Sequence, residues 1–399
     1  MRKTINIGDL GTIITGKTPP TTNKNYYGDY AVFIKPTDIS EQSKYTYETE
    51  EMYSKLAAEK YESSLIPKGA ICVPCIGTIG TKMTMAPCDC YTNQSINSII
   101  CNENYDNEYV YYLIKKFLPG LKAYNLGTAS GREYVSKSNF EKIELVAEQD
   151  KEIQKKIGVI LSRYDSLIEN YQKQIKLLEE AARRLYKEWF IDLRFPGHEN
   201  TKIVDGVPEG WERKKVNSII ELQSGFAFKS STFDDNGAYK IVTIKNVKDG
   251  AFDGDNVSRI VAIPEKMPKH CVLADGDILL SLTGNVGRVC IVNGKNYLLN
   301  QRVAKLATDY KAFAYCLFRS RDMFIEVNNL ANGAAQQNVS PIRIGEMKIL
   351  LPNNELLQEF ESIARKSIAR IISLQYQIRL LTEARDRLLP KLMSGEITV

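Results

Sequence analysis

Two stretches of the chain carry apolar residues at the spacing of long amphipathic helices. Between Glu148 and Phe190 there is no proline, and apolar or aromatic residues recur in steps of three and four, with one doubled four near Leu167. This pattern predicts helices that bury a narrow seam, with a stutter in the first one. The seam positions are Ile153, Ile157, Ile160, Tyr164, Leu167, Tyr171, Ile175, Leu178, Ala182, Leu185 and Trp189, then Leu357, Phe360, Ala364, Ser367, Ile371, Leu374, Ile378, Leu381, Arg385, Leu388 and Leu392.

Helices of this length need a long partner. About forty residues make a helix of roughly 60 Å, which one small domain cannot enclose. We expect the two helices to pair with each other as an antiparallel coiled coil. The alternative is that each helix packs along its own domain. Pro390 should kink or end the second helix.

The remaining sequence has the pattern of mixed α and β structure. Short β-rich runs, such as Tyr239–Ile244 and Asp277–Leu282, are separated by turn residues, whereas residues 107–117 and 311–327 have helical patterns. The fold class is therefore predicted as α+β, with two similar α+β domains separated by the two long helices. The expected order is a first domain at 1–147, a first spacer helix at 148–194, a second domain at 195–352 and a second spacer helix at 353–399.

An internal repeat supports this organisation. Each of several matched residues lies 207 positions from its counterpart (276 − 69 = 207), without a gap. A repeat of this size indicates duplication of a whole folding unit. The matched pairs are Gly69 and Gly276, Gly77 and Gly284, Gly80 and Gly287, Asn93 and Asn300, and Gln94 and Gln301.

Composition fits a folded, soluble chain. A hydrophobic content of 43% over 399 residues is enough for two cores. The start at Met1–Thr4 is charged, and no apolar run approaches a membrane span, so we expect a cytoplasmic protein without a membrane partner. The net charge of +5 permits nucleic-acid binding without requiring it.

The chain contains one pattern typical of nucleotide binding. Residues 11–18 match the phosphate-loop pattern G-x-x-x-x-G-K-[ST], which would make Lys17 a phosphate ligand. That loop must open into a helix, but Pro19 and Pro20 follow at once. The corresponding place in the second copy, Gln223–Lys229, lacks the pattern, which argues against nucleotide binding.

A zinc site is the second chemical alternative. Cys72, Cys75, Cys88 and Cys90 could supply four thiolates. At the repeat offset these cysteines fall on leucine, leucine, lysine and tyrosine, which favours buried small apolar side chains. With only His198 and His270 in the chain, and without a recognisable catalytic pair or triad, we predict no catalytic, cofactor or metal residues.

What remains is a set of polar, basic and aromatic loop residues that occur at similar places in both copies. Lysine and arginine can neutralise phosphates, and Gln, Asn and Arg can distinguish base pairs in the major groove. Ordinary loop chemistry is the alternative for any one of them. The predicted DNA-binding residues are Lys17, Thr18, Lys35, Thr37, Thr78, Lys82, Ser130 and Arg132 in the first copy, and Phe228, Lys229, Lys245, Asn246, Thr283, Asn285, Arg288, Arg302, Gln336, Gln337 and Asn338 in the second. Asn93-Gln94 and Asn300-Gln301 are expected to be structural because both copies share them.

With these motifs in this order, the whole chain resembles the specificity subunit of type I restriction–modification systems. The resemblance rests on the motifs Gly16–Pro19, Gly225–Lys229, Thr283–Gly287, Ala334–Ser340, Ile349–Pro352, Trp189–Asp192 and Gly210–Glu212. Gly16-Lys17 departs from the more usual paired glycine of the family.

The resemblance implies a non-catalytic subunit that recognises double-stranded DNA. Each domain would read one half of a split site, and the helices would set the gap; a spacer of roughly 60 Å corresponds to at most about 18 base pairs. It also implies two modification subunits that methylate adenine N6 with S-adenosylmethionine, and restriction subunits that use ATP. This chain would bind no cofactor; S-adenosylmethionine, ATP and Mg²⁺ are expected on the partners.

Two other functions remain open from the sequence. The chain could be a coiled-coil adaptor with two protein-binding domains, which would show no salt-dependent DNA binding. It could also be an ATP-binding enzyme that uses Lys17, in which case replacing Lys17 by alanine would change its behaviour toward nucleotide.

Overall fold

Two long helices stand out in the computed structural model, and both match the apolar seams of the sequence. Helix α4 spans Lys151–Tyr186 and helix α8 spans Asn354–Ser394. The sequence predicted that Pro390 would either kink or end the second helix. Helix α8 continues past Pro390, so the proline does not end it. The structure describes residues 1–125, 127, 133–254, 257–331 and 338–399.

The chain divides into two compact units, and both long helices contribute to each unit. Unit 1 consists of Met1–Asn170 together with Leu380–Val399, and unit 2 consists of Tyr171–Arg379. Unit 1 therefore contains the first part of α4 and the last part of α8, while unit 2 contains the other parts. The segment boundaries expected from the sequence stay a prediction.

Unit 1 is built on two small sheets and one strand pair. The first sheet is ordered β2-β9-β6-β7 with antiparallel neighbours, and the second is ordered β3-β5-β4-β8 with β4 and β8 parallel. Strand β1 pairs with β10 immediately before α4. The elements are β1 Arg2–Asn6, β2 Gly11–Thr15, β3 Tyr27–Gly28, β4 Ala31–Ile34, β5 Met52–Tyr53, α1 Lys55–Lys60, β6 Ile71–Pro74, β7 Thr84–Met85, β8 Tyr91–Thr92, β9 Ile96–Cys101, α2 Asn107–Phe117, α3 Lys137–Glu141 and β10 Glu144–Glu148.

Unit 2 repeats most of this topology. Its first sheet is ordered β14-β21-β18-β19, its second is ordered β16-β15-β20-β17 with β15 and β20 parallel, and β13 pairs with β22 immediately before α8. The duplication expected from the sequence is thus confirmed in the first sheet, in the parallel pair of the second sheet and in the strand pair before each long helix. The elements are β11 Ile203–Val204, β12 Val207–Pro208, β13 Glu212–Lys215, β14 Glu221–Ser224, β15 Tyr239–Val242, β16 Ser258–Ile260, β17 Val272–Leu273, β18 Ile278–Ser281, β19 Val289–Ile291, β20 Tyr297–Leu299, β21 Val303–Ala307, α5 Lys311–Phe318, α6 Arg321–Ala331, α7 Pro341–Gly345 and β22 Lys348–Leu351.

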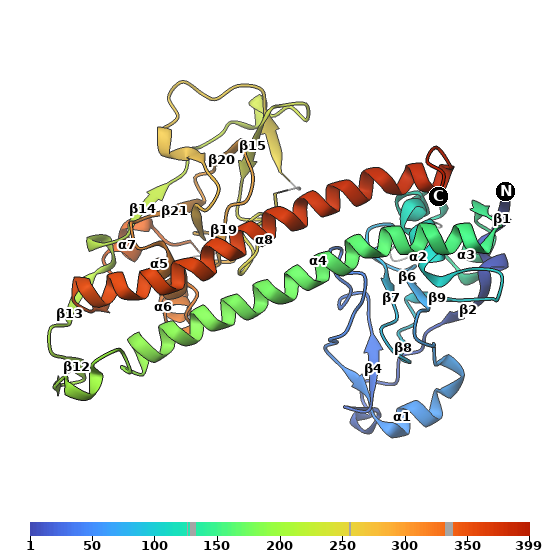
Figure 1. Ribbon diagram of the computed structural model, residues 1–399, viewed down its shortest axis with the longest axis horizontal. Helices are drawn as coiled ribbons and strands as arrows, with labels where there is room; N and C mark the ends of the chain where they lie inside the picture. The colour runs from blue at the N-terminus through green and yellow to red at the C-terminus, as the bar shows by residue number, and fades with distance from the viewer. Residues whose placement is uncertain (126, 128–132, 255–256, 332–337) are drawn as a thin grey trace. The chain divides into compact units, whose positions relative to one another are not determined.

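In unit 1 the beginning of α4 and the end of α8 lie side by side and antiparallel (Figure 1). Ile157 and Leu161 of α4 share one apolar core with Leu389, Leu392 and Met393 of α8. The same core takes in residues of α2 and of the β2-β9-β6-β7 sheet. In unit 1 the two helices therefore pack against each other and also against the globular part, so both arrangements considered from the sequence occur there.

In unit 2 an aromatic cluster joins the end of α4 to the beginning of α8. A π-helical turn at Lys187–Ile191 continues α4, and both Trp189 and Phe190 are buried there. Their rings lie 5.7 and 4.9 Å from the ring of Phe360 on α8. The wider turn places two consecutive aromatic side chains in one core, where large rings contribute most to burial.

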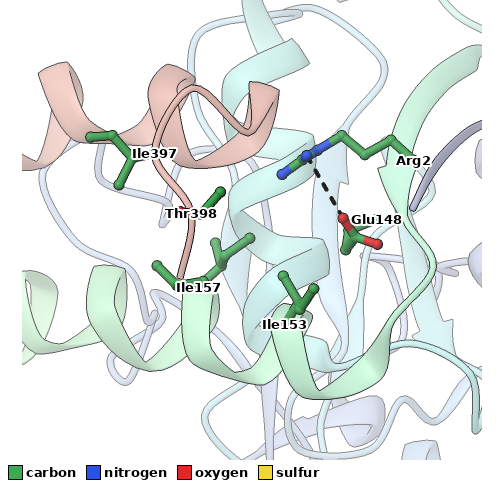
Figure 2. A pocket seen from close by; sticks show the side chains of 7 residues that line it. Arg2, Glu148, Ile153, Ile157, Ile397 and Thr398 are labelled. Atoms are coloured by element: carbon green, nitrogen blue, oxygen red, sulfur yellow. Dashed lines mark ion pairs between the residues drawn. The ribbon is translucent and has the colours of Figure 1, made fainter.

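A small cavity lies in unit 1 beside the C-terminal residues. Its volume is about 70 Å³, and Figure 2 shows Arg2 and Glu148, two of its lining residues, joined by an ion pair. The Arg2 guanidinium lies 3.8 Å from the Glu148 carboxylate. Small-molecule sites usually measure roughly 300–1,000 Å³, so this cavity is too small for a nucleotide. Its lining residues are Arg2, Glu148, Ile153, Ile157, Ile397, Thr398 and Val399.

Candidate nucleic-acid interface

Three chain segments meet at one end of the first sheet in unit 1, and backbone hydrogen bonds join them. The Gly16 amide donates to the Ile96 carbonyl at 3.2 Å, and the Lys17 amide donates to the Thr92 carbonyl at 2.9 Å. The Asn93 amide in turn donates to the carbonyl of Ile34, the last residue of β4, at 3.1 Å. The loops that carry Lys17, Lys35 and Gln94 are therefore neighbours.

Unit 2 has the same three bonds at equivalent positions. The Gly225 amide donates to the Val303 carbonyl at 3.3 Å, and the Phe226 amide donates to the Leu299 carbonyl at 2.8 Å. The Asn300 amide donates to the Val242 carbonyl at 3.1 Å. The two units thus share one loop scaffold, on which different side chains are displayed.

Gly16 and Gly225 are required by close backbone contacts in this scaffold. A Cβ on Gly16 would lie 2.1 Å from the Thr92 carbonyl oxygen, and a Cβ on Gly225 would lie 2.2 Å from that of Asn300. Gly11–Thr15 is a strand, and residues 16–20 form no helix. The match to a phosphate loop therefore lacks the helix N-terminus on which phosphate binding depends, and packing explains Gly16.

A fourth segment joins the scaffold through an isolated bridge in each unit. Ile76 pairs with Tyr134 in unit 1, and Thr283 pairs with Asn338 in unit 2. The Gly77 amide also donates to the Glu133 carbonyl at 3.0 Å. The loop that begins at residue 76 or 283 therefore lies next to the segment that precedes α3 or α7.

The shared Asn-Gln pairs divide into a structural residue and an exposed one. The Asn93 side-chain oxygen accepts from the Ser95 amide at 3.1 Å, and that of Asn300 accepts from the Arg302 amide at 3.2 Å. These bonds confirm a structural role for both asparagines. Gln94 and Gln301 are exposed, and the Thr18 hydroxyl donates to the Gln94 side-chain oxygen. Both glutamines were expected to be structural because they repeat; their polar type next to a variable loop was the available signal for a contact residue.

Most of the predicted DNA-contacting residues reach the surface. Lys35, Lys82, Phe228 and Arg288 are half-buried. Ser130, Arg132, Gln336 and Gln337 lie outside the described residues. The exposed ones are Lys17, Thr18, Thr37, Thr78, Lys229, Lys245, Asn285, Arg302 and Asn338.

The basic residues differ in how much charge they offer. The Lys35 ammonium lies 2.8 Å from a carboxylate oxygen of Glu50 and 3.2 Å from one of Glu51. Burial alone would lower the pKa of Lys35, but the two carboxylates outweigh it and raise that pKa. Lys35 is thus neutralised locally. Within the part of the chain that the structure describes, the exposed Lys17 ammonium donates to a neutral group, the Ser63 hydroxyl, at 3.3 Å. Lys17 is the better phosphate contact of the two.

Two predicted contact residues are buried, which corrects the expectation from the sequence. Asn246 has no exposed surface; its side chain accepts from the Thr243 amide at 2.8 Å and donates to the Asp253 carbonyl at 2.9 Å. Thr283 is 5% exposed and donates to the Asn338 side-chain oxygen at 2.9 Å. Contact with DNA would require these turns to open, so we assign both residues a structural role.

Phe228 belongs to a small aromatic pair at the edge of unit 2. Its ring lies 5.2 Å from that of Phe226 in an edge-to-face arrangement, and both rings pack on the core around β15 and β20. Phe226 and Phe228 thus anchor the loop that presents the exposed Lys229. In unit 1 the same place is occupied by Lys17 and Thr18, so the two units present different chemistry there.

Of the four cysteines considered as a zinc site, three belong to apolar cores and Cys88 is exposed. Cys72 and Cys90 pack in one core of unit 1, whereas Cys75 packs in another. Burial raises the pKa of the Cys72 and Cys75 thiols to about 12, so neither readily forms the thiolate that binds zinc. Among the described residues, His, Cys, Asp and Glu form no cluster of three or more that could hold a metal ion.

A search of the described part of the chain finds no helix with the length and apolar character needed to cross a membrane.

Comparison with known proteins identifies related sequences over nearly the whole chain. Residues 2–180 and 208–385 match the family described as "Type I restriction modification DNA specificity domain". The MjaIX specificity subunit of a type I restriction enzyme from Methanocaldococcus jannaschii is 28% identical, and the alignment covers 98% of this chain and 93% of that one. The MjaVIII specificity subunit from the same organism is 31% identical over 75% of this chain and 72% of its own length.

A solved structure agrees with the fold. The type I restriction–modification S subunit from M. genitalium superposes with a TM-score of 0.59 over 98% of this chain and 96% of that one. At 16% sequence identity, this likeness concerns the fold alone.

Proposed function

This chain belongs to the family of type I restriction–modification DNA specificity subunits, and on that basis we propose that each of its units reads one half of a split DNA site. The recognition loops are those at the end of the first sheet in each unit. The long helices act as the spacer that sets the gap between the two half-sites.

The repeated loop scaffold is the observation that carries this proposal. Equivalent backbone bonds hold Gly16 and Gly225 in place, while the next residues differ, with Lys17-Thr18 in unit 1 and Phe226–Lys229 in unit 2. A constant frame with variable exposed side chains suits two domains that recognise different sequences. Lysines on such loops neutralise phosphates, and Asn285, together with the other exposed amides and arginines, can discriminate bases.

The chemistry of the complex belongs to partner subunits in this proposal. The chain itself is non-catalytic and binds no cofactor. Two modification subunits bring S-adenosylmethionine and methylate adenine N6, and restriction subunits bring ATP and Mg²⁺ for translocation and cleavage. The complex works in the cytoplasm on double-stranded DNA.

Sequencing of N6-methyladenine in cells with and without this chain tests the proposal. Cells that express the chain with its partner methyltransferase should carry one methylated motif made of two half-sites and a fixed gap, and deletion of the chain should abolish it. A contiguous motif, or methylation that is indifferent to the chain, would contradict the proposal.

A protein-binding adaptor on a coiled coil is not favoured by the family match. An adaptor would be distinguished by binding to proteins without salt-dependent binding to DNA. For a DNA-reading chain, affinity for the methylated motif should fall as salt rises, because each phosphate contact releases counterions.

A further inference from the structure

A buried charge pair interrupts the apolar contact between α4 and α8 in unit 1. Asp165 on α4 is 4% exposed and Arg385 on α8 is 7% exposed. Both lie amid leucine and isoleucine positions of the helices, where an apolar residue would be the ordinary choice. The DNA-reading loops do not involve either residue, so the pair calls for another explanation.

The geometry ties three elements of unit 1 together. The Arg385 guanidinium forms an ion pair with one oxygen of the Asp165 carboxylate. The Tyr112 hydroxyl on α2 donates to the other oxygen at 2.5 Å. Arg385 also donates from Nε to the Asp386 carboxylate at 2.9 Å. One Asp165 oxygen is therefore bonded to α8 and the other to α2.

The charges hold their ionised forms in spite of burial. Burial would raise the pKa of Asp165, but Lys115, Arg385 and the Tyr112 hydroxyl outweigh it and keep that pKa below its usual value. Burial would lower the pKa of Arg385, but the neighbouring Asp165 carboxylate outweighs burial and raises that pKa. Each charge thus depends on the other being in place.

A buried ion pair of this kind contributes more to selecting one alignment of the helices than to the free energy of unfolding. Removing two charges from water is costly, so an apolar pair of similar size would serve stability as well or better, whereas one unpaired buried charge strongly destabilises a fold. Leucines can pack against other leucines one heptad away, but a shift of one heptad along α4 would place Gly158 or Gln172 opposite Arg385 in place of Asp165. A polar pair inside an apolar seam therefore selects one register.

Unit 2 contains a related arrangement, also with a carboxylate from α4. The Tyr315 hydroxyl on α5 donates to Glu179 at 2.7 Å, and Arg319 lies 3.4 Å from the same carboxylate. Arg319 also pairs with Asp249 at 2.9 Å. Glu179 follows Asp165 by fourteen positions, which is two heptads along α4. In each unit an α4 carboxylate thus meets a tyrosine of the globular part.

We propose that Asp165, Arg385 and Tyr112 form a register lock that selects one alignment of α8 against α4 and thereby one gap length in the recognised DNA. The inference rests on the proposed function, in which the helices set the gap. All three are positioning residues, because they act through the helices and not on DNA.

The decisive experiment replaces the lock by apolar residues in the full chain. The variant Asp165→Leu, Arg385→Leu, Tyr112→Phe should fold with an unfolding temperature equal to or above that of the wild type. Its methylated sites, produced with the partner methyltransferase and sequenced, should keep both half-sites but vary in gap. A slip of one heptad is roughly 10 Å, or about three base pairs, and methylation at such sites should rise at least about tenfold.

A conservative variant and a surface control sharpen the result. Arg385→Lys keeps a cation opposite Asp165 and should retain a single gap, whereas Arg385→Leu alone should destabilise the fold by removing the ion-pair partner of the buried Asp165 carboxylate. The control pair Glu180–Arg184 is an exposed ion pair on α4, and Glu180→Leu with Arg184→Leu should leave the gap unchanged.

The outcomes separate this inference from the function on which it rests. A stably folded apolar variant that still methylates a single gap would overturn the register lock and leave the proposed function intact. A wild-type methylome without a split motif would overturn both.

Discussion

At the residue scale, Gly16 and Gly225 hold the recognition loops against the sheet. No side chain fits at either position, because the neighbouring backbone lies closer than a Cβ contact allows. The sequence showed that both copies have a glycine there, but the reason is a contact with residues more than seventy positions away. Local patterns do not contain such contacts.

Gly225→Ala should destabilise unit 2 and weaken reading of one half-site. The new Cβ would lie 2.2 Å from the Asn300 carbonyl oxygen, so the loop must move, and overpacking of this kind costs about 1–3 kcal/mol. Denaturant unfolding and DNA binding measure the two effects. Ala227→Ser in the same loop is the control and should change stability by less than about 0.5 kcal/mol. Equal behaviour of the two variants would contradict the packing role of Gly225.

Glu148 should make the stability of unit 1 depend on pH. Burial would raise its pKa, but the N-terminal ammonium and the amides of Asp150 and Gln149 outweigh it and keep the pKa below the ordinary 4.5. The carboxylate thus stabilises the fold above the unfolded pKa, and this contribution is lost as pH falls through the lower folded pKa.

Unfolding of Glu148→Gln across pH 7 to 3 checks this expectation. The variant should be about 1–3 kcal/mol less stable than the wild type at pH 7, and the difference should shrink toward pH 3. Glu144→Gln, at an exposed position of the same strand, should follow the wild type throughout. A difference for Glu148→Gln that stays constant with pH would refute the linkage.

Asn246 illustrates why single contact residues were harder to predict than the loops that carry them. Lys35 in the first copy, and Lys245 and Asn246 in the second, were predicted to contact DNA from similar places. In the structure, Lys35 and Asp38 form the same turn as Thr243 and Asn246. Asn246 therefore occupies the turn position of Asp38 and does not lie at the position after Lys35. In the sequence alone, a polar residue that closes a turn cannot be distinguished from one that contacts a base.

At the scale of the elements, the apolar spacing predicted both long helices but not the full width of their buried face. Leu167, a predicted seam position, is 44% exposed, whereas its neighbour Ile168 is 3% exposed. The predicted seam assumed one partner, but α4 packs on both the globular part and α8, so its buried face is wider. Arg385, which the seam also included, is indeed buried.

Inserting one helical turn into α4 between Asp165 and Leu178 should lengthen the gap in the recognised DNA. A turn adds about 5.4 Å, or roughly two base pairs, and the recognition loops are untouched. Both half-sites should persist in the methylome. A changed half-site would mean that the helices do more than space the domains. An insertion of the same length in the exposed chain at 202–206 should leave the gap unaltered.

At the scale of the whole molecule, the duplicated topology was readable from the sequence because glycines and turns recur at one offset. The first sheets have the same strand order in both units, and each second sheet contains a parallel pair, β4–β8 or β15–β20. The return of residues 380–399 to unit 1 was less accessible. The sequence predicted that the two helices pair, but which globular core receives the last turns of α8 depends on side-chain packing at long range.

Replacing residues 1–145 by the equivalent segment of a relative should change one half-site only. The reason is that each unit carries its own complete set of recognition loops. Methylome sequencing of the chimera gives the result directly. A second chimera that also exchanges residues 380–399 should read the same new half-site and be more stable, because the core of unit 1 then receives its matching helix end. A change in both half-sites would contradict the separation of the two readers.

The place of Leu389, Leu392 and Met393 in the core of unit 1 has a consequence for biosynthesis. Residues 1–170 leave the ribosome first, yet their core is incomplete until the final residues follow. At about 5–20 residues per second, synthesis of the intervening 171–379 segment takes roughly 10 to 40 s. The core of unit 2 is itself complete only when Phe360 and Ile371 of α8 have been made. Unit 1, although its first residues are made before those of unit 2, therefore also waits for the end of α8, and a nascent chain that stalls early leaves the apolar core of unit 1 incomplete and accessible to chaperones and proteases.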